Sequence, residues 1–240
     1  MKFDFHSHIL PGVDDGSRSL EESIEMLKLQ ASQGIDHVVA TPHFYANCDT
    51  PERFLKRRQD AFERVQEEME KHSGLPRVSL GAEVYYFRGI SESDGLLDLT
   101  FGNKRFILLE MPEMPWTQRM LEEIRQIYVK QGIVPVIAHI DRYISPFRTY
   151  GIFKKLRDMP VLVQANAGFF LRAATRSMAL RMLRRDQIQL LGSDCHNLTS
   201  RVPNLGPACQ IIEDRLGPEV LERMDQCGAD VLSDESNMIC

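Results

Sequence analysis

The sequence predicts an α/β protein in which a single domain, residues 1–240, forms a parallel barrel of seven strand–helix units. Short apolar runs with the length of buried strands alternate along the chain with longer segments that carry an apolar stripe at helical spacing. In addition, six of these runs end in His, Asp or Glu side chains. The functional groups of βα barrels lie at the carboxyl ends of the strands, so both observations indicate the same fold class.

The expected strands are apolar runs of the length that is typical of parallel strands covered on both faces. No linker, repeat or low-complexity segment interrupts their alternation with helical segments, which favours one domain. The polar stretch from Gly228 onward is expected to be loosely held. The seven expected strands lie near 2–6, 36–41, 78–83, 105–110, 133–138, 160–165 and 187–192.

The first expected helix follows the first strand. Ser19 and Glu22 have the spacing of a capping box, in which each side chain accepts a backbone N–H at the start of the helix. Gly34 is a typical residue to end it. The apolar stripe of this helix consists of Leu20, Ile24, Leu27 and Ala31.

Two further helices have clear start and end signals. Thr50 and Pro51 suit a cap and a first helical position, and Gly74 ends the stripe of Phe54, Phe62, Val65 and Met69. Thr117 begins the next helix and Gly132 ends it, with a stripe of Met120, Leu121, Ile124 and Tyr128. Helices are also expected near 149–157, 174–185 and 204–226.

Composition argues against some classes of function. The net charge of −5 argues against a basic surface that binds nucleic acid. The local basic cluster Lys56–Arg58 is expected to be a solvent-exposed helix face. No apolar run approaches the roughly 18 residues that span a bilayer, and no signal-peptide region precedes the first acid, so we expect a cytoplasmic protein. The five cysteines show neither zinc spacing nor a disulfide framework, and free thiols are expected.

A histidine pair at the first strand is the strongest sign of a metal site. Side chains two positions apart on a strand share a face, so His6 and His8 can bind one cation together. Alone, two partly buried polar histidines are an equally good reading. Asp194 and His196 repeat the spacing near the last strand, and a closed sheet brings the first and last strands together.

Further ligand-type residues follow the intervening strands. Glu83 and Glu110 end two of them, where a carboxylate can bridge two ions, and an unpaired buried carboxylate is costly. His43 and His139 follow two others, and ligation becomes the better reading for them only together with the rest. The loop Asp14–Gly16 reads by itself as an ordinary Asp-Gly turn.

Imidazole and carboxylate ligands favour manganese, iron or zinc, and do not choose among these three. Clustered ions of this kind serve hydrolytic displacement, and phosphate esters are natural substrates for them. Arginine usually assists phosphate recognition. Arg142 lies three residues past His139, and Arg201 five past His196. Each arginine alone could equally be an ordinary surface residue.

Several segments together resemble a known family. Residues 6–16 read HSHILPGVDDG, residues 41–43 TPH, residues 81–86 GAEVYY, residues 137–143 IAHIDRY and residues 193–197 SDCHN. In order and spacing, over nearly the whole chain, these resemble the polymerase and histidinol phosphatase (PHP) superfamily. Within it they are most similar to the metal-dependent protein-tyrosine phosphatases of bacterial capsule and exopolysaccharide operons.

The resemblance implies a single distorted (β/α)7 TIM-like barrel, the PHP fold, with three divalent ions at the carboxyl ends of its strands, usually manganese. It implies that Arg142 and Arg201 bind the phosphoryl group. The implied substrate is a phosphotyrosine protein, in particular an autophosphorylating bacterial tyrosine kinase. The implied ligands are His6, His8, Glu83 and Asp194 for one ion, Asp15, His43 and His196 for a second, and Glu83, Glu110 and His139 for a third, with Glu83 bridging.

Other functions are weaker readings of the same residues. A PHP-type phosphatase for a small ester such as histidinol phosphate is the nearest alternative. A cysteine-dependent phosphatase would use the Cys195-x5-Arg201 spacing, but no glycine lies between these two residues. An amidohydrolase would need a bridging lysine where Glu110 stands, and a metal-stabilised binding protein would not need so many ligands. The roles of segments 44–47 and 111–116, which can border the substrate mouth, stay open.

Overall fold

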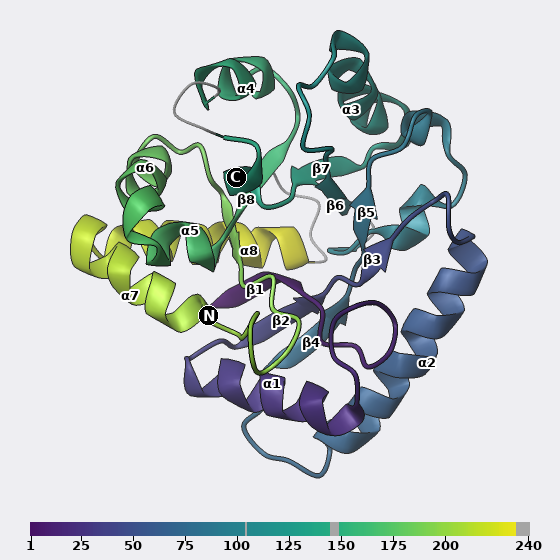
Figure 1. Ribbon diagram of the computed structural model, residues 1–240, viewed down its shortest axis with the longest axis vertical. Coiled ribbons are helices and arrows are strands. Elements are labelled where there is room, and N and C mark those ends of the chain that lie inside the picture. The colour runs from purple at the N-terminus through teal and green to yellow at the C-terminus, as the bar shows by residue number, and fades with distance from the viewer. Residues whose placement is uncertain (104, 145–148, 234–240) are drawn as a thin grey trace.

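The computed structural model describes residues 1–103, 105–144 and 149–233. Parallel strands occupy the middle of the molecule and helices surround them (Figure 1). The strands are β1 (Phe3–Ser7), β2 (His37–Ala40), β3 (His43–Phe44), β4 (Arg77–Leu80), β5 (Glu83–Tyr85), β6 (Phe106–Glu110), β7 (Val134–Ile137), β8 (Leu162–Asn166) and β9 (Leu190–Gly192). The helices are α1 (Leu20–Ser32), α2 (Pro51–Met69), α3 (Gln118–Gln131), α4 (Thr149–Leu156), α5 (Ala167–Leu171), α6 (Ala173–Arg184), α7 (Leu205–Leu216) and α8 (Pro218–Leu232).

The strands form two curled parallel sheets. The chain passes from one sheet to the other where β2 leads into β3 and where β4 leads into β5. One sheet has the order β1-β2-β4 and the other β3-β5-β6-β7-β8-β9. All ladder pairs between named strands are parallel, as expected for strands that alternate with helices. The alternating α/β organisation predicted from the sequence is therefore confirmed for the described residues.

The expected strands 36–41 and 78–83 each bend and continue as a second short strand. Pro42 has no N–H for the ladder, and β2 gives way to β3 there, just as β4 gives way to β5 beyond Gly81. Register is kept across the bend, because His37 pairs with Arg77 and His43 pairs with Glu83. His43 and Glu83 thus begin a strand rather than follow one, which corrects the expectation.

A buried arginine holds this bend. Arg58 of α2 donates from Nη1 to the Gly81 carbonyl at 2.7 Å and from Nη2 to the Asp98 carbonyl at 3.1 Å. The expectation of a solvated basic face at Lys56–Arg58 is wrong for this residue, which is 8% exposed. The helix period places Arg58 in line with buried Phe54 and Ala61, so its guanidinium must reach inward.

The first and last strands lie side by side. Ser7 and Cys195 form a parallel bridge just beyond β9. The His8 N–H donates to the Cys195 carbonyl at 2.9 Å, and the Asp194 N–H donates to the His6 carbonyl at 2.8 Å. The two ligand-type pairs at the opposite ends of the sequence therefore meet in space.

The core has an inner and an outer part. Phe106, Leu108, Val134 and Val136 belong to a cluster enclosed by the strands, whereas the alternate residue Ile107 joins the larger cluster beneath the helices. This alternation is what a sheet covered on both faces produces. The enclosed cluster includes Phe3, Phe5, Val39, Phe101, Phe106, Leu108, Val134, Val136, Ala138, Leu162, Leu190, Cys227 and Val231.

The last two of these residues belong to α8, which packs against the sheet. Gly228 approaches so closely that an added Cβ would lie 2.7 Å from Phe3 Cδ2. The expectation of a loosely held tail from Gly228 is therefore wrong as far as Leu232, and residues 234–240 lie outside the described part. The expected helix 204–226 is divided between α7 and α8, because Gly217 (φ 90°) and Pro218, which has no N–H, interrupt it.

The predicted helix caps are largely confirmed. The Ser19 hydroxyl accepts the Glu22 N–H at 3.2 Å, but the Glu22 carboxylate accepts the Arg18 N–H instead of completing a capping box with Ser19. The Thr50 hydroxyl caps α2, and Gly132, with φ of 68°, ends α3.

The expectation of free thiols holds in part. Cys48, Cys195 and Cys209 are free. Cys227 is disulfide-bonded, which corrects the expectation at that position, and Cys240 lies outside the described residues. Among the helices of the described residues, none is long and apolar enough to cross a bilayer.

Candidate metal centre

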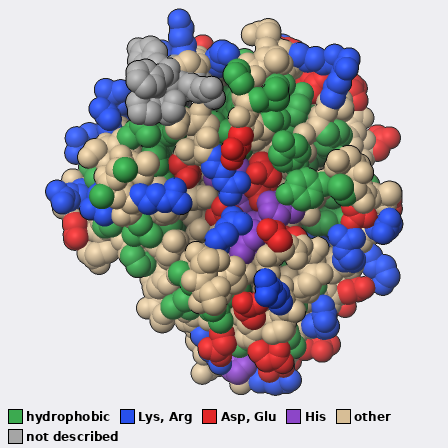
Figure 2. Space-filling view, in the orientation of Figure 1, with side chains coloured by type: hydrophobic (Ala, Val, Ile, Leu, Met, Phe, Trp, Pro, Cys, Tyr) green, Lys and Arg blue, Asp and Glu red, His purple; other side chains and the backbone are tan. Residues whose placement is uncertain are grey.

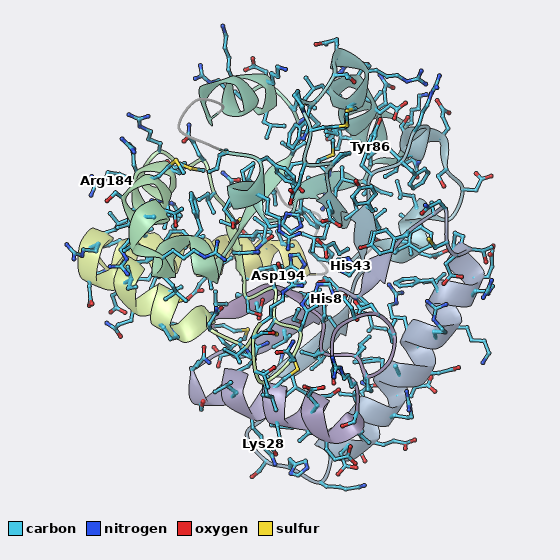
Figure 3. All side chains as sticks on the ribbon, in the orientation of Figure 1. His8, Lys28, His43, Tyr86, Arg184 and Asp194 are labelled. Atoms are coloured by element: carbon cyan, nitrogen blue, oxygen red, sulfur yellow. The ribbon has the colours of Figure 1, made fainter. Side chains whose placement is uncertain are left out.

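The nine residues expected to be metal ligands all meet at one edge of the sheet. Figure 3 shows His8, His43 and Asp194 converging near the middle of the molecule, whereas Lys28 and Arg184 lie at its periphery. Three overlapping groups of ligand-type atoms, each within 4.8 Å of one another, occur there. They are His6, His8 and Asp194; His8, Asp15, His43 and His196; and His43, Glu83 and Glu110.

The first group is wholly buried. The Nε2 atoms of His6 and His8 lie 3.0 Å apart. Glu83 Oε2 is 3.0 Å from the former and 3.3 Å from the latter. Asp194 Oδ1 lies 3.4 and 3.5 Å from the same two nitrogens. Two imidazoles and two carboxylates therefore direct their ligand atoms at one small space.

The second group lies nearer to solvent. Asp15 Oδ1 is 3.6 Å from His43 Nε2 and 3.4 Å from His196 Nε2. The His8 and His196 rings are 3.8 Å apart at their centroids, so this group adjoins the first. The Asp15 side chain is 69% exposed, in contrast to the buried histidines that it faces.

The third group centres on Glu83 and Glu110. His139 Nε2 lies 2.7 Å from Glu83 Oε1 and 3.5 Å from Glu110 Oε1. His139 and Asp194 both have left-handed backbones, with φ of 30° and 53°. Non-glycine residues rarely adopt this conformation, and it occurs often where side chains are aimed at a functional site.

The donor set fits cations. Glu83 Oε2 lies within 3.0 Å of His6 Nε2 and of His43 Nδ1 but meets neither with hydrogen-bond geometry. His43 Nδ1 and His196 Nε2 are also buried without a hydrogen bond in the described structure. Buried polar atoms without partners are costly, and divalent ions are natural partners for convergent imidazole and carboxylate lone pairs.

The electrostatics of the cluster favour negative carboxylates. Burial opposes charge on Glu83, yet the surrounding histidines, with His6 the strongest, hold its pKa well below its ordinary value. Burial also opposes charge on His139, but hydrogen bonds to Glu110 and Glu83 raise its pKa to about 9. The ionised carboxylates thus attract positive charge strongly, whether it comes from protons or from metal ions.

A supporting layer of side chains, absent from the sequence-based expectations, orients the ligands. Asp14 Oδ2 accepts from His8 Nδ1 at 2.7 Å and from the His43 N–H at 2.9 Å. Because His8 and His43 hold the pKa of Asp14 well below its usual range despite burial, its carboxylate only accepts, and His8 carries its proton on Nδ1. The first aspartate of the Asp-Gly turn is therefore a positioning residue.

Asp4 and Gln164 belong to the same layer. Asp4 accepts from the Ser193 N–H at 2.8 Å and from the Ser193 hydroxyl at 2.6 Å, which ties β1 to the segment after β9. Gln164 Oε1 accepts the His139 N–H at 2.7 Å and lies 3.3 Å from His6 Nδ1. Asn166 Nδ2 donates to Asp194 Oδ2 at 2.9 Å. Gln164 and Asn166 alternate with apolar residues in this strand, and that pattern in the sequence could have indicated that both polar side chains face the site.

Both predicted arginines reach the cluster. Arg142 Nη2 lies 2.8 Å from Asp194 Oδ2, and Arg201 Nη2 lies 2.6 Å from Asp194 Oδ1. Arg142 Nη1 also lies 3.1 Å from Glu110. In the space-filling view, basic side chains border one side of the histidine and carboxylate cluster and hydrophobic side chains border the other (Figure 2).

Cys195 is not placed as a nucleophile. Its side chain is wholly buried, and burial raises the pKa of its thiol far above the ordinary value. A thiolate nucleophile needs an accessible, electropositive position, so the geometry contradicts the cysteine-dependent alternative.

The fold and the cluster together define a class: an α/β protein with parallel strands and a site suited to several metal ions at their carboxyl edge. The protein belongs to the CpsB/CapC family of capsular polysaccharide synthesis, which it matches over residues 2–230. The family resemblance expected from the motifs is thereby confirmed.

Relatives with tyrosine-protein phosphatase names span nearly the same length. The protein is 30% identical over 226 residues to the tyrosine-protein phosphatase CpsB of Streptococcus agalactiae serotype III (strain NEM316), which covers 90% of this chain and 91% of that protein. It is 27% identical over 222 residues to the tyrosine-protein phosphatase YwqE of Bacillus subtilis (strain 168), covering 90% and 86% of the two chains.

A solved structure shares the fold. It is one of the crystal structures of YwqE from Bacillus subtilis and CpsB from Streptococcus pneumoniae, which are described as unique metal-dependent tyrosine phosphatases. The match has a TM-score of 0.82 at 23% identity and covers 98% of this chain and 96% of that chain. A curled parallel α/β architecture is thus common to both.

Proposed function

We propose that this protein is a metal-dependent protein-tyrosine phosphatase that hydrolyses phosphotyrosine in proteins. The observation that carries the proposal is the convergence of nine ligand-type residues beside two arginines that contact the same aspartate. Imidazole and carboxylate ligands supply metal sites, and guanidinium groups supply bidentate contacts to phosphoryl oxygens. Relatives that match 90% of the chain carry the name tyrosine-protein phosphatase.

We propose three divalent ions, with manganese as the first choice and iron or zinc as alternatives. The overlap of three ligand groups supports this number, and the position of Glu83 Oε2 between His6 and His43 supports a bridging role for Glu83. The proposed ligands are His6, His8, Glu83 and Asp194; Asp15, His43 and His196; and Glu83, Glu110 and His139. We also propose that the curled sheet is a closed, distorted seven-stranded barrel, which the Ser7–Cys195 bridge supports.

In the reaction, ions bound at these ligands would lower the pKa of a bound water and neutralise charge on the ester. Arg142 and Arg201, whose guanidinium groups lie beside Asp194, would bind the outward phosphoryl oxygens and stabilise the charge that develops on them. Asp14 accepts the His8 proton on Nδ1, so that Nε2, which faces the cluster, is the nitrogen that would bind an ion. Gln164 Oε1 lies near His6 Nδ1 and accepts the His139 N–H, so it helps to orient both residues.

The proposed physiological substrate is an autophosphorylating bacterial tyrosine kinase in the cytoplasm. Membership of a capsular polysaccharide synthesis family supports a kinase substrate that controls this synthesis. The alternative, hydrolysis of a small ester such as histidinol phosphate, uses the same ligands and differs only in what lies around them.

A metal-swap assay tests the proposal. Metal-stripped protein is reloaded with manganese, iron or zinc, and turnover of a phosphotyrosine peptide is compared with that of histidinol phosphate. We expect metal-dependent turnover with a clear preference for the peptide. A preference for histidinol phosphate would support the alternative, and no turnover of either ester with any of the three metals would contradict phosphatase activity.

Paired variants make the assay specific to the cluster. His8→Ala removes a residue of two ligand groups and should abolish activity and lower bound metal. His72→Ala is the matched control, because His72 lies beyond the end of α2 beside Glu68 and outside the cluster. Equal metal content and activity in the two variants would count against this site.

A further inference from the structure

Two aromatic side chains stand out in the described part of the chain as exposed, Tyr45 (37%) and Tyr128 (39%). They lie at opposite edges of the sheet. Tyr45 follows His43 by two residues, on the edge of the cluster, whereas Tyr128 lies near the end of α3 that leads into the start of β7. Exposed aromatic rings are common ligand contacts, because they offer a large rigid face at little entropic cost.

The Tyr45 ring lies one side chain away from the cluster. It stacks on the His43 ring, with centroids 5.3 Å apart and an interplanar angle of 28°. It also lies against Tyr85, with centroids 5.8 Å apart. His43 in turn faces Glu83, its Nδ1 being 3.0 Å from Glu83 Oε2. The remaining surface of the Tyr45 ring is open to solvent beside the site.

The backbone that carries Tyr45 is anchored. The N–H groups of Cys48 and Asp49 donate to the Tyr45 carbonyl at 2.9 and 3.1 Å. The Asp49 carboxylate then pairs with Arg57 of α2. An aromatic ring held in place in this way loses little conformational entropy when a ligand packs on it.

We propose that Tyr45 determines specificity for aromatic phosphate esters by packing on the phenyl ring of phosphotyrosine. The inference rests on the proposed phosphatase function. In phosphotyrosine the ring is bonded directly to the ester oxygen, so a surface that recognises the ring must lie within one side chain of the phosphoryl site. Tyr45 stacks on the proposed ligand His43, which puts its ring one side chain away from the ligand cluster, and serine or threonine esters carry no ring that could pack on it. The hydrophobic border opposite the basic border of the cluster agrees with this arrangement (Figure 2).

The test compares two phosphopeptides of one sequence that differ only in phosphotyrosine or phosphoserine. Tyr45→Ala should lower the ratio of kcat/KM between the phosphotyrosine and the phosphoserine peptide by about five- to twentyfold, mainly through KM for the phosphotyrosine peptide. Tyr45→Phe should keep the wild-type ratio, because the ring and not the hydroxyl makes the contact.

Tyr128→Ala is the matched control, since it removes a tyrosine of similar exposure at the other edge of the sheet. Its ratio should equal that of the wild type. Elemental analysis of all variants checks that the metal content is unchanged. An equal loss on both peptides in Tyr45→Ala would mean that the tyrosine merely positions His43, and would overturn the proposal.

A binding measurement separates this inference from the proposed function. Calorimetric titration of the metal-loaded protein with benzylphosphonate, a non-hydrolysable analogue of phenyl phosphate, and with inorganic phosphate should show tighter binding of the aromatic ligand, and Tyr45→Ala should remove that difference. If the wild type hydrolyses no phosphotyrosine peptide, the proposed function fails while this titration still decides the role of Tyr45. Equal affinity for both ligands in the wild type would overturn the role.

Discussion

Arg201 donates to Asp194 across 2.6 Å, and it does so at the oxygen atom that faces the ring nitrogens of His6 and His8. Arg142 occupies the other carboxylate oxygen at 2.8 Å. Burial alone would raise the pKa of Asp194, but His6 and His8 hold it well below its ordinary value. The carboxylate is thus shared between the ligand cluster and the two arginines, so the groups proposed to bind metal and the groups proposed to bind phosphate are coupled.

This coupling leads to a prediction for the arginines. Arg142→Ala and Arg201→Ala should each lower kcat/KM for a phosphotyrosine peptide by roughly a hundredfold, because a preorganised donor to the phosphoryl oxygens is lost. Metal content should be retained, since guanidinium is not a ligand and its removal leaves Asp194 freer to attract cations. Lysine at either position should restore activity only in part.

Steady-state kinetics beside elemental analysis decides the point. Arg184→Ala, at the exposed end of α6, is the control for removal of an arginine. Near-normal kcat/KM in both alanine variants would show that the arginines do not handle the phosphate.

The Asp14–His8 contact predicts a role for a residue outside the ligand set. Asp14→Asn keeps the size of the side chain but replaces an acceptor-only carboxylate with an amide, so the His8 tautomer is no longer enforced. We expect metal affinity to fall by about 10- to 100-fold, as for other groups that orient metal ligands. Competition with a metallochromic chelator measures it. Asp94→Asn, at an exposed position, is the control, and unchanged affinity in Asp14→Asn would show that His8 is oriented without it.

Cys195 gives a prediction of the opposite kind. Cys195→Ser should keep most of the phosphatase activity, because the thiol is buried beneath the site and Gln30 Nε2, 3.8 Å from its sulfur, can donate to the serine hydroxyl as well. Thiol-alkylating reagents should likewise leave activity intact. Loss of turnover in this variant at unchanged metal content would revive a cysteine-dependent mechanism.

The pH dependence of stability can be predicted at Asp225 of α8, which lies beside Phe3, Leu221 and Met224, away from the cluster. Partial burial raises the pKa of Asp225 to about 6, the N-terminal amino group and Lys2 oppose the shift, and Asp36 adds to it. The folded state therefore holds the proton more tightly than the unfolded chain. This contribution to stability is complete below the unfolded pKa near 4 and is lost as pH rises to about 6.

Asp225→Asn should accordingly stabilise the protein at pH 7, by about 1 kcal/mol once solvent screening of a half-buried group is allowed for, and should have little effect at pH 4. Urea unfolding at the two pH values measures the difference. Glu222→Gln, an exposed carboxylate on the same helix, is the control. A gain that is equal at both pH values would point to packing or hydrogen bonding instead of titration.

The sequence by itself predicted most of the elements and the kinds of side chain that gather at the site. Helix starts at Ser19, Thr50 and Thr117 depend on hydrogen bonds to backbone three residues away, and such local signals can be read from spacing. The alternation of His6 and His8 on one face depends only on the strand period. The break at Gly217–Pro218 was also a local signal, and the prediction of one helix over 204–226 did not use it.

Only the tertiary structure decided which residues support the site. Asp4 meets Ser193 across 189 positions of the sequence, and Gln164 meets His6 across 158. No periodicity within the chain encodes such contacts, because they arise when the sheet curls and brings the first strand beside the last. The same curvature bends β2 into β3 and places both arginines on Asp194. Local hydrogen bonds and the side-chain period of each element thus determine the helices and strands. Long-range packing determines which carboxylate each histidine and each arginine contacts.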